Sequence, residues 1–219
     1  MIPLRSSERT YSSPAVTLSL ILANVAVFLF ELTLSARGLD RFLVLYGIVP
    51  DRLHYSSLLT SMFLHGGFLH VAGNMWFLWI FGKGVEDLLG HSRFLFFYLA
   101  CGLAAGLLHV AVNPSSPVPA IGASGAIAGV MGAYLVKFPR ARINTLVPIV
   151  IFLTTVELPA WFLLIYWFAI QFFSGVGSIG TSDLSQGGVA WFEHIGGFLA
   201  GVALVSVMPA RRRVYRGWS

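Results

Sequence analysis

Six long apolar stretches constrain the fold of this chain more than any other feature of its sequence. They run over residues 15–35, 62–82, 94–112, 122–137, 158–174 and 191–209. A helix needs about 20 apolar residues to cross a bilayer, because each backbone polar group must be satisfied within the segment when water is absent. We therefore predict an all-α, polytopic membrane protein, a bundle of six transmembrane helices.

The composition excludes a soluble globular domain. Hydrophobic residues make up 57% of the 219 residues, and 14 Lys and Arg with 9 Asp and Glu give only 11% charged residues, against roughly 25% in soluble domains. The net charge of +5 comes from basic residues in short segments between the apolar stretches. That placement indicates orientation in a membrane and argues against a nucleic-acid partner. The single cysteine, Cys101, allows no disulfide within the chain.

Lysine and arginine residues mark the predicted cytoplasmic side. They follow the second and fourth stretches and cluster after the sixth, whereas segments 113–121 and 175–190 contain neither residue. Because short cytoplasmic loops collect Lys and Arg, both termini are predicted to be cytoplasmic. Residues 1–14 would be a short tail, 15–209 the membrane domain and 210–219 a basic tail. We expect a multi-pass protein of a bacterial inner membrane; the sequence does not fix its oligomeric state.

Two segments do not fit a simple alternation of helices and loops. The apolar run 143–175 is too long for one crossing and contains two prolines and a glutamate. We interpret residues 143–157 as a re-entrant or interfacial approach to the fifth helix. The loop 35–57 carries three arginines although it lies on the predicted outer side, and we interpret it as a structured loop at the membrane surface.

Polar side chains near the start of three stretches fall at one predicted depth. His70 and Asn74 belong to the second stretch, Ser124 to the fourth and His194 to the sixth. These stretches are all entered from the predicted outer side, and at 1.5 Å per residue Ser124 and His194 lie about 5–10 Å below that surface. Polar groups at this depth cost free energy and usually mark function.

Glycines would let the fourth and sixth helices pack closely. Ser124 is flanked by Gly122 and Gly125, and the sixth stretch carries Gly197 and Gly201 in a small-xxx-small pattern, which lets another helix backbone approach. Two such helices packed together would bring the serine and the histidine within hydrogen-bond reach.

This arrangement suits an activated nucleophile. His194 could take the Ser124 proton during attack on a peptide bond and return it to the leaving amine. Glu193 diverges from His194 by about 100° around the helix, so we predict a dyad without an acidic third member. His70 and Asn74 share one helix face and would point two donors at the developing oxyanion, with the Ser124 backbone N–H as a third.

Three motifs occur in this order on the second, fourth and sixth stretches: His65-Gly-Gly-Phe-Leu-His70-Val-Ala-Gly-Asn74, Gly122-Ala-Ser124-Gly125 and His194-Ile-Gly-Gly-Phe-Leu-Ala-Gly201. Together they resemble the rhomboid family of intramembrane serine proteases, over about residues 58–208. The resemblance implies cleavage of single-span membrane proteins within or beside their transmembrane segment, without a cofactor or metal. Ser124 matches the family's nucleophile, His194 its general base, and His70 and Asn74 its oxyanion-hole residues.

Two positions depart from the family pattern. Some members carry a tyrosine one turn after the serine, packed on the catalytic histidine, where this chain has Ala128. We expect Phe192 or Phe198 to hold the histidine ring instead. Glu193 replaces a small residue before the histidine, and both departures could alter the pH profile.

The resemblance also assigns roles to the fifth stretch and to the loop after it. The glycine-rich segment 174–188 would be the lid, and the bulky aromatic side chains of 158–173 would line the side through which a substrate helix enters. His65 is expected to tie down the loop after the first stretch, and His109 to pack between helices.

Two other interpretations stay open. A catalytically silent rhomboid-like protein would bind membrane clients without cutting them. A transporter would need polar residues through the full depth of the bundle, yet the predicted cytoplasmic halves of the second, fourth and sixth stretches are almost wholly apolar. A metal site built from the histidines is disfavoured, because the spacing of His65 and His70 suits no common helical ligand pair.

Overall fold

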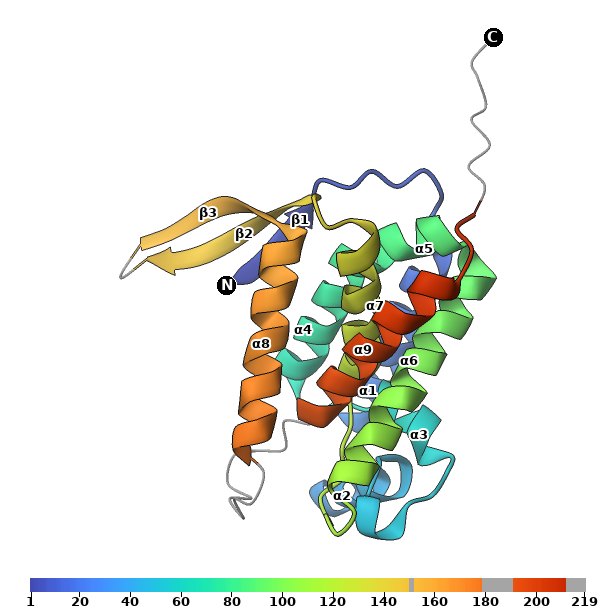
Figure 1. The fold of residues 1–219 in the computed structure, drawn as a ribbon. Helices are drawn as coiled ribbons and strands as arrows, with labels where there is room; N and C mark the ends of the chain where they lie inside the picture. The colour runs from blue at the N-terminus through green and yellow to red at the C-terminus, as the bar shows by residue number, and fades with distance from the viewer. Residues whose placement is uncertain (150–151, 179–190, 212–219) are drawn as a thin grey trace.

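The computed structural model describes residues 1–149, 152–178 and 191–211, and shows a helical bundle with a small sheet at one end (Figure 1). Its helices are α1 (Ala15–Glu31), α2 (Ala36–Tyr46), α3 (Ser57–Thr60), α4 (Phe68–Phe77), α5 (Lys83–Leu89), α6 (His91–Val112), α7 (Ser124–Lys137), α8 (Ala160–Ser178) and α9 (Trp191–Val207), with short turns η1 (Pro50–Arg52), η2 (Ser61–Phe63) and η3 (Leu78–Gly82). The chain is therefore mostly helical. We call the end that carries the sheet the sheet end of the bundle.

Each predicted apolar stretch corresponds to a helix or a run of helices. By length and composition, α6 and α8 are long and apolar enough to cross a membrane, and α1, α7 and α9 are shorter apolar helices among the residues described. The second stretch needs correction, because α4, the π-helical η3 and α5 continue one another over residues 68–89. The charged residues Lys83, Glu86 and Asp87, which follow the second predicted stretch, are therefore helical.

A buried carboxylate makes that extension possible. Glu86 on α5 is fully buried, and its oxygens accept the backbone N–H groups of Val16 and Thr17 at 2.8 Å and the Thr17 hydroxyl at 2.6 Å. These N–H groups open α1, where no carbonyl of the helix can pair them and the helix dipole favours a negative charge. The carboxylate is thus compensated by the start of another helix and by the His91 ring, whose Nδ1 lies 2.6 Å from Oε1.

The all-α prediction misses a three-stranded sheet. β1 (Ile2–Ser6) pairs antiparallel with β2 (Arg142–Ile149), which pairs antiparallel with β3 (Phe152–Pro159). Residues 143–149 and 152–157, interpreted as part of a re-entrant or interfacial approach to the fifth helix, form paired strands that project beside the start of α8 (Figure 1). Their placement relative to the membrane stays a prediction. β-branched residues are frequent in this hairpin and favour a pleated strand over a helix. The predicted N-terminal tail, 1–14, likewise contributes a strand.

The opposite end of the bundle holds the loop that we expected to be structured. It contains α2 (Figure 1) and η1. The ring of Phe42 on α2 contacts that of Phe30 on α1, with ring centroids 5.5 Å apart. Between the two ends, α7 lies inside the bundle, and its residues from Gly125 to Tyr134 are all buried. The helix that begins with Ser124 is therefore the central element of the core.

Candidate active site

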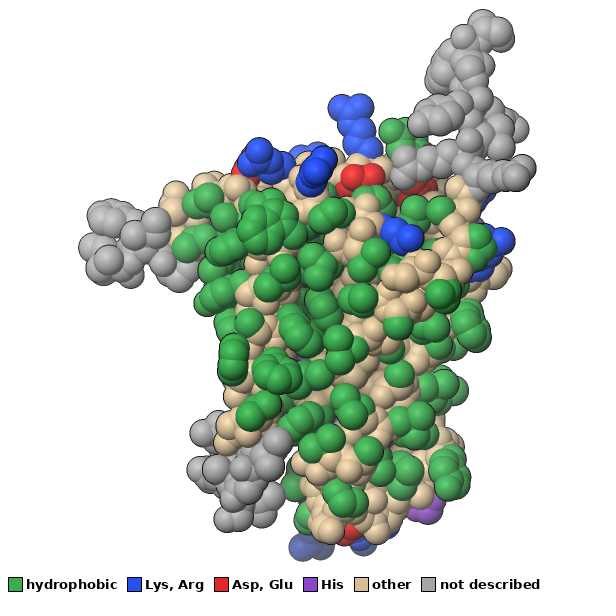
Figure 2. All heavy atoms as spheres, viewed as in Figure 1, with side chains coloured by type: hydrophobic (Ala, Val, Ile, Leu, Met, Phe, Trp, Pro, Cys, Tyr) green, Lys and Arg blue, Asp and Glu red, His purple; other side chains and the backbone are tan. Residues whose placement is uncertain are grey.

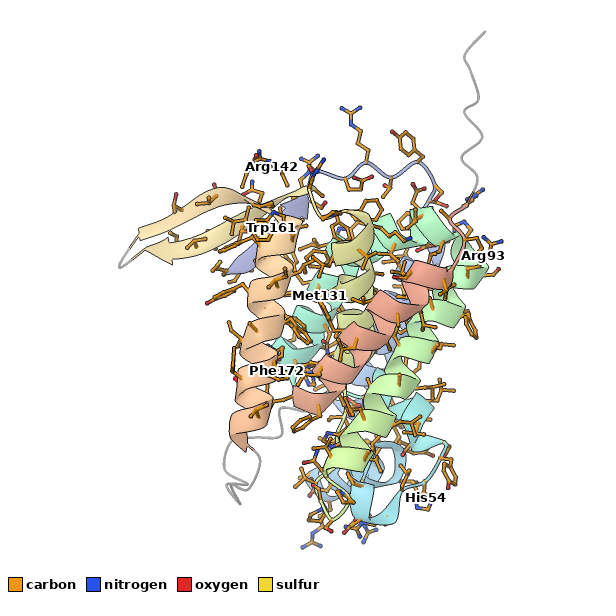
Figure 3. The ribbon with its side chains drawn as sticks, viewed as in Figure 1. His54, Arg93, Met131, Arg142, Trp161 and Phe172 are labelled. Carbon is orange, nitrogen blue, oxygen red and sulfur yellow. The ribbon has the colours of Figure 1, made fainter. Side chains whose placement is uncertain are left out.

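One cavity of about 860 Å³ brings together the four side chains predicted to react or to stabilise the oxyanion. His70 and Asn74 reach it from α4, Ser124 from the first residue of α7, and His194 from the first turn of α9. The rest of the wall is mostly apolar and includes Met131, which lies within the bundle (Figure 3). The cavity can therefore hold an apolar segment of chain beside a few polar groups, as binding sites commonly do.

Backbone contacts between α7 and α9 fix how closely Ser124 and His194 approach. A Cβ atom added at Gly201 would lie 2.6 Å from the Gly129 Cα, and one added at Gly197 would lie 2.8 Å from the Gly125 carbonyl carbon. Real Cβ atoms essentially never come within 3.0 Å of such atoms. Both positions on α9 therefore require glycine, and the small-xxx-small pattern packs against the backbone of α7.

The tautomer of His194 follows from one hydrogen bond. Its Nδ1 lies 2.6 Å from Oε1 of Gln171, a buried residue on α8. An amide oxygen can only accept, so the ring proton is on Nδ1 and Nε2 is left as an acceptor. This is the protonation state that a general base needs toward a serine hydroxyl.

Aromatic rings from α8 and α9 hold the imidazole from the side. The ring centroid of Trp167 lies 5.6 Å from that of His194, and the Trp191 ring lies edge-on at 6.4 Å. Among the described residues, neither Phe192 nor Phe198 makes a ring contact with His194, contrary to our expectation. Phe198 instead stacks on Phe168, 4.6 Å away.

Two donors converge just before Ser124. The Gly66 N–H approaches Nδ1 of His70 at 3.4 Å, which makes Nδ1 the acceptor and leaves the proton on Nε2. Nε2 of His70 and Nδ2 of Asn74 lie 2.8 and 3.5 Å from where a Cβ of Gly122 would be. Nδ2 of Asn74 is buried and has no hydrogen-bond partner among the described residues. These two N–H groups are therefore free to bind an oxyanion.

The backbone at Gly122 gives the donors their room. Its φ of +127° lies in the region that favours glycine, and its N–H donates to the Ser61 carbonyl at 2.9 Å. A larger residue would be strained, and its side chain would collide with the donors. The Gly-Ala-Ser-Gly motif thus supplies an open turn immediately before the helix that carries Ser124.

Ser124 and His194 share the cavity wall without a direct hydrogen bond between their side chains, within the part of the chain that the structure describes. Catalytic hydrogen bonds are often long in an empty site and tighten when substrate binds. Glu193 is buried, and its Oε1 has no partner among the described residues. It therefore does not orient His194, as its divergence around the helix predicts.

His65 supports the site from behind. Its backbone N–H donates to the Glu31 carboxylate at the end of α1, at 3.2 Å, and its ring packs edge-on against His70 with centroids 5.1 Å apart. His109 lies on α6 and does not line the cavity. The predicted lid, 174–188, divides at the end of α8: residues 174–178 are helical, and residues 179–188 lie outside the described residues.

Sequence reasoning missed Gln171 and the role of Trp167. Gln171 is a strongly polar side chain in the apolar α8, and polar groups in such helices are usually functional. That rule, applied to the fifth stretch as it was to the second, fourth and sixth, would have identified it.

Several known proteins resemble this chain in sequence. Residues 52–211 match the family model described as the Rhomboid domain. The chain is 30% identical over 186 residues to "Rhomboid protein 1, mitochondrial" of Saccharomyces cerevisiae, which covers 82% of this chain and 49% of that protein. It is 46% identical over 78 residues to "Rhomboid protease GluP" of Bacillus subtilis, covering 36% of this chain and 15% of that protein.

A third relative comes from a human mitochondrion. The "Presenilin-associated rhomboid-like protein, mitochondrial" of Homo sapiens is 32% identical over 127 residues, covering 57% of this chain and 33% of that protein. The chain thus spans about half the length of these relatives or less. The family model nevertheless matches most of the chain and confirms the resemblance read from its three motifs, so this membrane protein belongs to the rhomboid family.

Proposed function

We propose that the chain is an intramembrane serine endopeptidase, which hydrolyses peptide bonds within or next to the transmembrane segments of single-span membrane proteins. One observation above all supports this proposal. The hydrogen bond from Nδ1 of His194 to Gln171 makes Nε2 a base, in the cavity that also holds the hydroxyl of Ser124. A packing role for the two residues would not require that tautomer.

The reaction would proceed through an acyl-enzyme. Nε2 of His194 takes the Ser124 proton while Oγ attacks the carbonyl carbon of the scissile bond. The N–H groups of His70 and Asn74 bind the oxygen as it becomes negative. The tetrahedral intermediate then collapses, the C–N bond breaks, and the imidazolium gives its proton to the departing amine. Water, deprotonated by the same Nε2, then attacks the ester carbon. The C–Oγ bond breaks, the peptide leaves with a new carboxyl terminus, and the imidazolium returns the proton to Oγ of Ser124.

Gln171 would be a positioning residue in this sequence of steps. It touches neither substrate nor the reacting atoms, but it selects the tautomer of His194 and fixes the plane of its ring. Because Gln171 belongs to α8, the helix proposed to flank the path of the substrate, an outward movement of α8 would weaken the base. If a substrate displaces α8 as it enters, α8 would have to return to its packed position before the serine is activated.

We further propose six membrane crossings, formed by α1, the run α4–η3–α5, α6, α7, α8 and α9, with both termini in the cytoplasm. Basic side chains gather at the sheet end, above a wide apolar belt (Figure 2). Arg93 and Arg142 lie at that end and His54 at the opposite end (Figure 3). The positive-inside rule favours the sheet end as cytoplasmic. Named relatives include mitochondrial proteins, and the bacterial inner membrane stays a prediction.

The proposal is tested with purified protein, a panel of labelled single-span substrates and a serine-reactive fluorophosphonate. The protein should cleave at least one substrate and take up the label, and Ser124→Ala and His194→Ala should lose both. Ser206→Ala is the matched control, because the Ser206 hydroxyl donates its hydrogen bond to the Val202 carbonyl within α9. Cleavage that persists in Ser124→Ala would refute the dyad. A protein that is folded and takes up the label but cleaves no substrate would favour a client-binding member of the family.

A further inference from the structure

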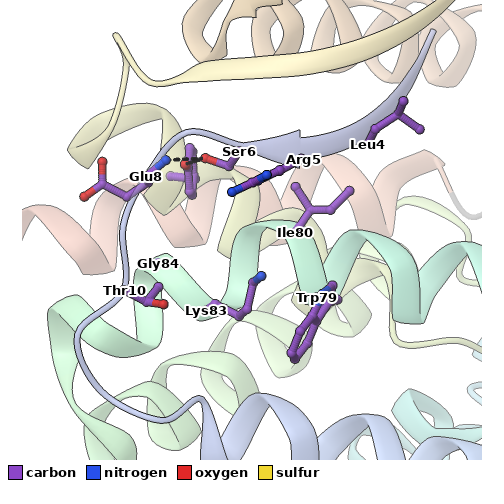
Figure 4. Close-up of a pocket in the computed structure, with 10 residues that line it drawn as sticks. Leu4, Arg5, Ser6, Glu8, Thr10, Trp79, Ile80, Lys83 and Gly84 are labelled. Carbon is purple, nitrogen blue, oxygen red and sulfur yellow. Dashed lines mark hydrogen bonds between the residues drawn. The ribbon is translucent and has the colours of Figure 1, made fainter.

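A second cavity, of about 310 Å³, lies at the sheet end of the bundle and shares no wall residue with the active site (Figure 4). One side of it is formed by β1 and the segment that follows, including Arg5 and Thr10. The other side is formed by η3 and α5, including Trp79 and Lys83. The chain thus folds its first residues over a hollow that the helices alone would leave open.

The charges in this cavity are unbalanced. The side chains of Arg5 and Lys83, both positively charged, reach it from opposite sides (Figure 4). Neither forms an ion pair with any residue in the described part of the chain, although Glu8 lies on the same wall. Two like charges brought together by the fold cost free energy unless an anion lies between them. The cavity therefore has the charge of an anion site.

Tryptophan side chains place the cavity at the edge of the apolar belt. The Lys83 Nζ lies 4.2 Å from the centroid of the Trp79 ring, which is 41% exposed. Trp76, one turn earlier and 45% exposed, donates its indole N–H to the Pro3 carbonyl at 2.6 Å. Tryptophan is enriched where hydrocarbon meets the headgroups, which is the depth at which lipid phosphates lie. Basic clusters at the cytoplasmic surface also attract anionic lipids.

We infer that this cavity binds the phosphodiester headgroup of an anionic membrane phospholipid, with Arg5 and Lys83 on the phosphate oxygens and the Trp79 ring against the glycerol and the first methylenes. A guanidinium can take two phosphate oxygens at once, while an ammonium contributes a compact charge. Because β1 pairs with β2 and carries Arg5, a bound headgroup would also fasten the sheet to α5. Under the proposed orientation the site lies in the cytoplasmic leaflet, and headgroup binding there does not depend on peptidase activity.

The experiment uses the full chain in a neutral detergent. Native mass spectrometry counts the lipids retained from phosphatidylglycerol and from phosphatidylcholine, and the unfolding temperature is measured with each lipid and with inorganic phosphate alone. We expect phosphatidylglycerol to be retained at least about tenfold more strongly and to raise the unfolding temperature. An equal rise with inorganic phosphate would show a site for a soluble anion and overturn the lipid assignment.

Single substitutions locate the site. Arg5→Gln and Lys83→Gln should each weaken retention of phosphatidylglycerol by about tenfold, since a charge-assisted hydrogen bond is lost. Arg9→Gln is the matched control, a basic side chain of the same segment that does not line the cavity. The exposed Arg5 keeps the test valid if Lys83→Gln fails to fold. Equal losses in all three variants, or none, would mean general surface attraction and would overturn the proposal.

Discussion

The substitution Gly201→Ala tests whether the contact between α7 and α9 sets the activity. The new Cβ would lie 2.6 Å from the Gly129 Cα, whereas carbon atoms rest at about 3.5–4.0 Å. The two helices must therefore separate by about 1 Å. Overpacking of this kind costs about 1–3 kcal/mol of stability, and a 1 Å displacement of reacting groups can reduce a rate by about 100-fold.

The position of Gly201 makes the result informative. It lies two turns along α9 from His194, so the new methyl group cannot touch the substrate or the imidazole. We expect kcat/KM for a single-span substrate to fall by about 100-fold in a variant that still unfolds cooperatively. Gly177→Ala on α8 is the control, because a Cβ there has nothing within 4 Å. Activity of Gly201→Ala within about twofold of the unsubstituted protein would refute the reasoning.

Substitutions at three further positions test the site and the fold. Gln171→Leu should lower kcat by at least about tenfold with little change in KM. Gln171→Glu should recover part of the lost kcat. It should also move the acidic limb of the pH–rate profile to higher pH, because a carboxylate favours protonated His194 and the base must be neutral. Gly122→Ala should lower kcat in the same peptidase assay, since its methyl group would fill the oxyanion position. Glu86→Gln should lower the free energy of unfolding by about 1–3 kcal/mol, measured in detergent, because the start of α1 at Thr17 loses a charge-assisted acceptor. An unchanged pH profile in Gln171→Glu, full activity in Gly122→Ala, or unchanged stability in Glu86→Gln would contradict the respective argument.

Hydropathy alone located α1, α6, α7, α8, α9 and most of the run α4–η3–α5, because hydrocarbon leaves a spanning backbone almost no alternative. It did not predict the strands at residues 143–149 and 152–157, which are as apolar as a membrane segment but form a hairpin. Length and charge cannot separate the two, whereas the Ile, Val and Thr content of β2 and β3 points to strands. Hydropathy also failed at Glu86. A carboxylate beside an apolar stretch predicts a loop unless its hydrogen-bond partner, here the first turn of α1, is known.

The site was predictable to the extent that polar side chains are rare in such helices. Ser124, His194, His70 and Asn74 could be grouped by depth, and the glycines indicated which helices touch. The rotation of each helix about its own axis could not be derived from the sequence. Rotation decides that Gln171, rather than the adjacent Glu193, meets the imidazole of His194, and that Trp167 rather than Phe198 covers it.

The choice of Gln171 over a carboxylate has a physical consequence for the proposed reaction. A charged group at the centre of a membrane helix costs about 2.5–3.5 kcal/mol on insertion scales, whereas an amide orients the ring and carries no charge. None of the groups proposed to react is then permanently charged before substrate binds. The imidazolium and the oxyanion form together and neutralise each other, but the imidazolium lacks the stabilisation that an aspartate provides in soluble serine proteases. We therefore expect a slow peptidase, and we expect Gln171→Glu to lose stability in the membrane because it places a carboxylate where the amide carries no charge.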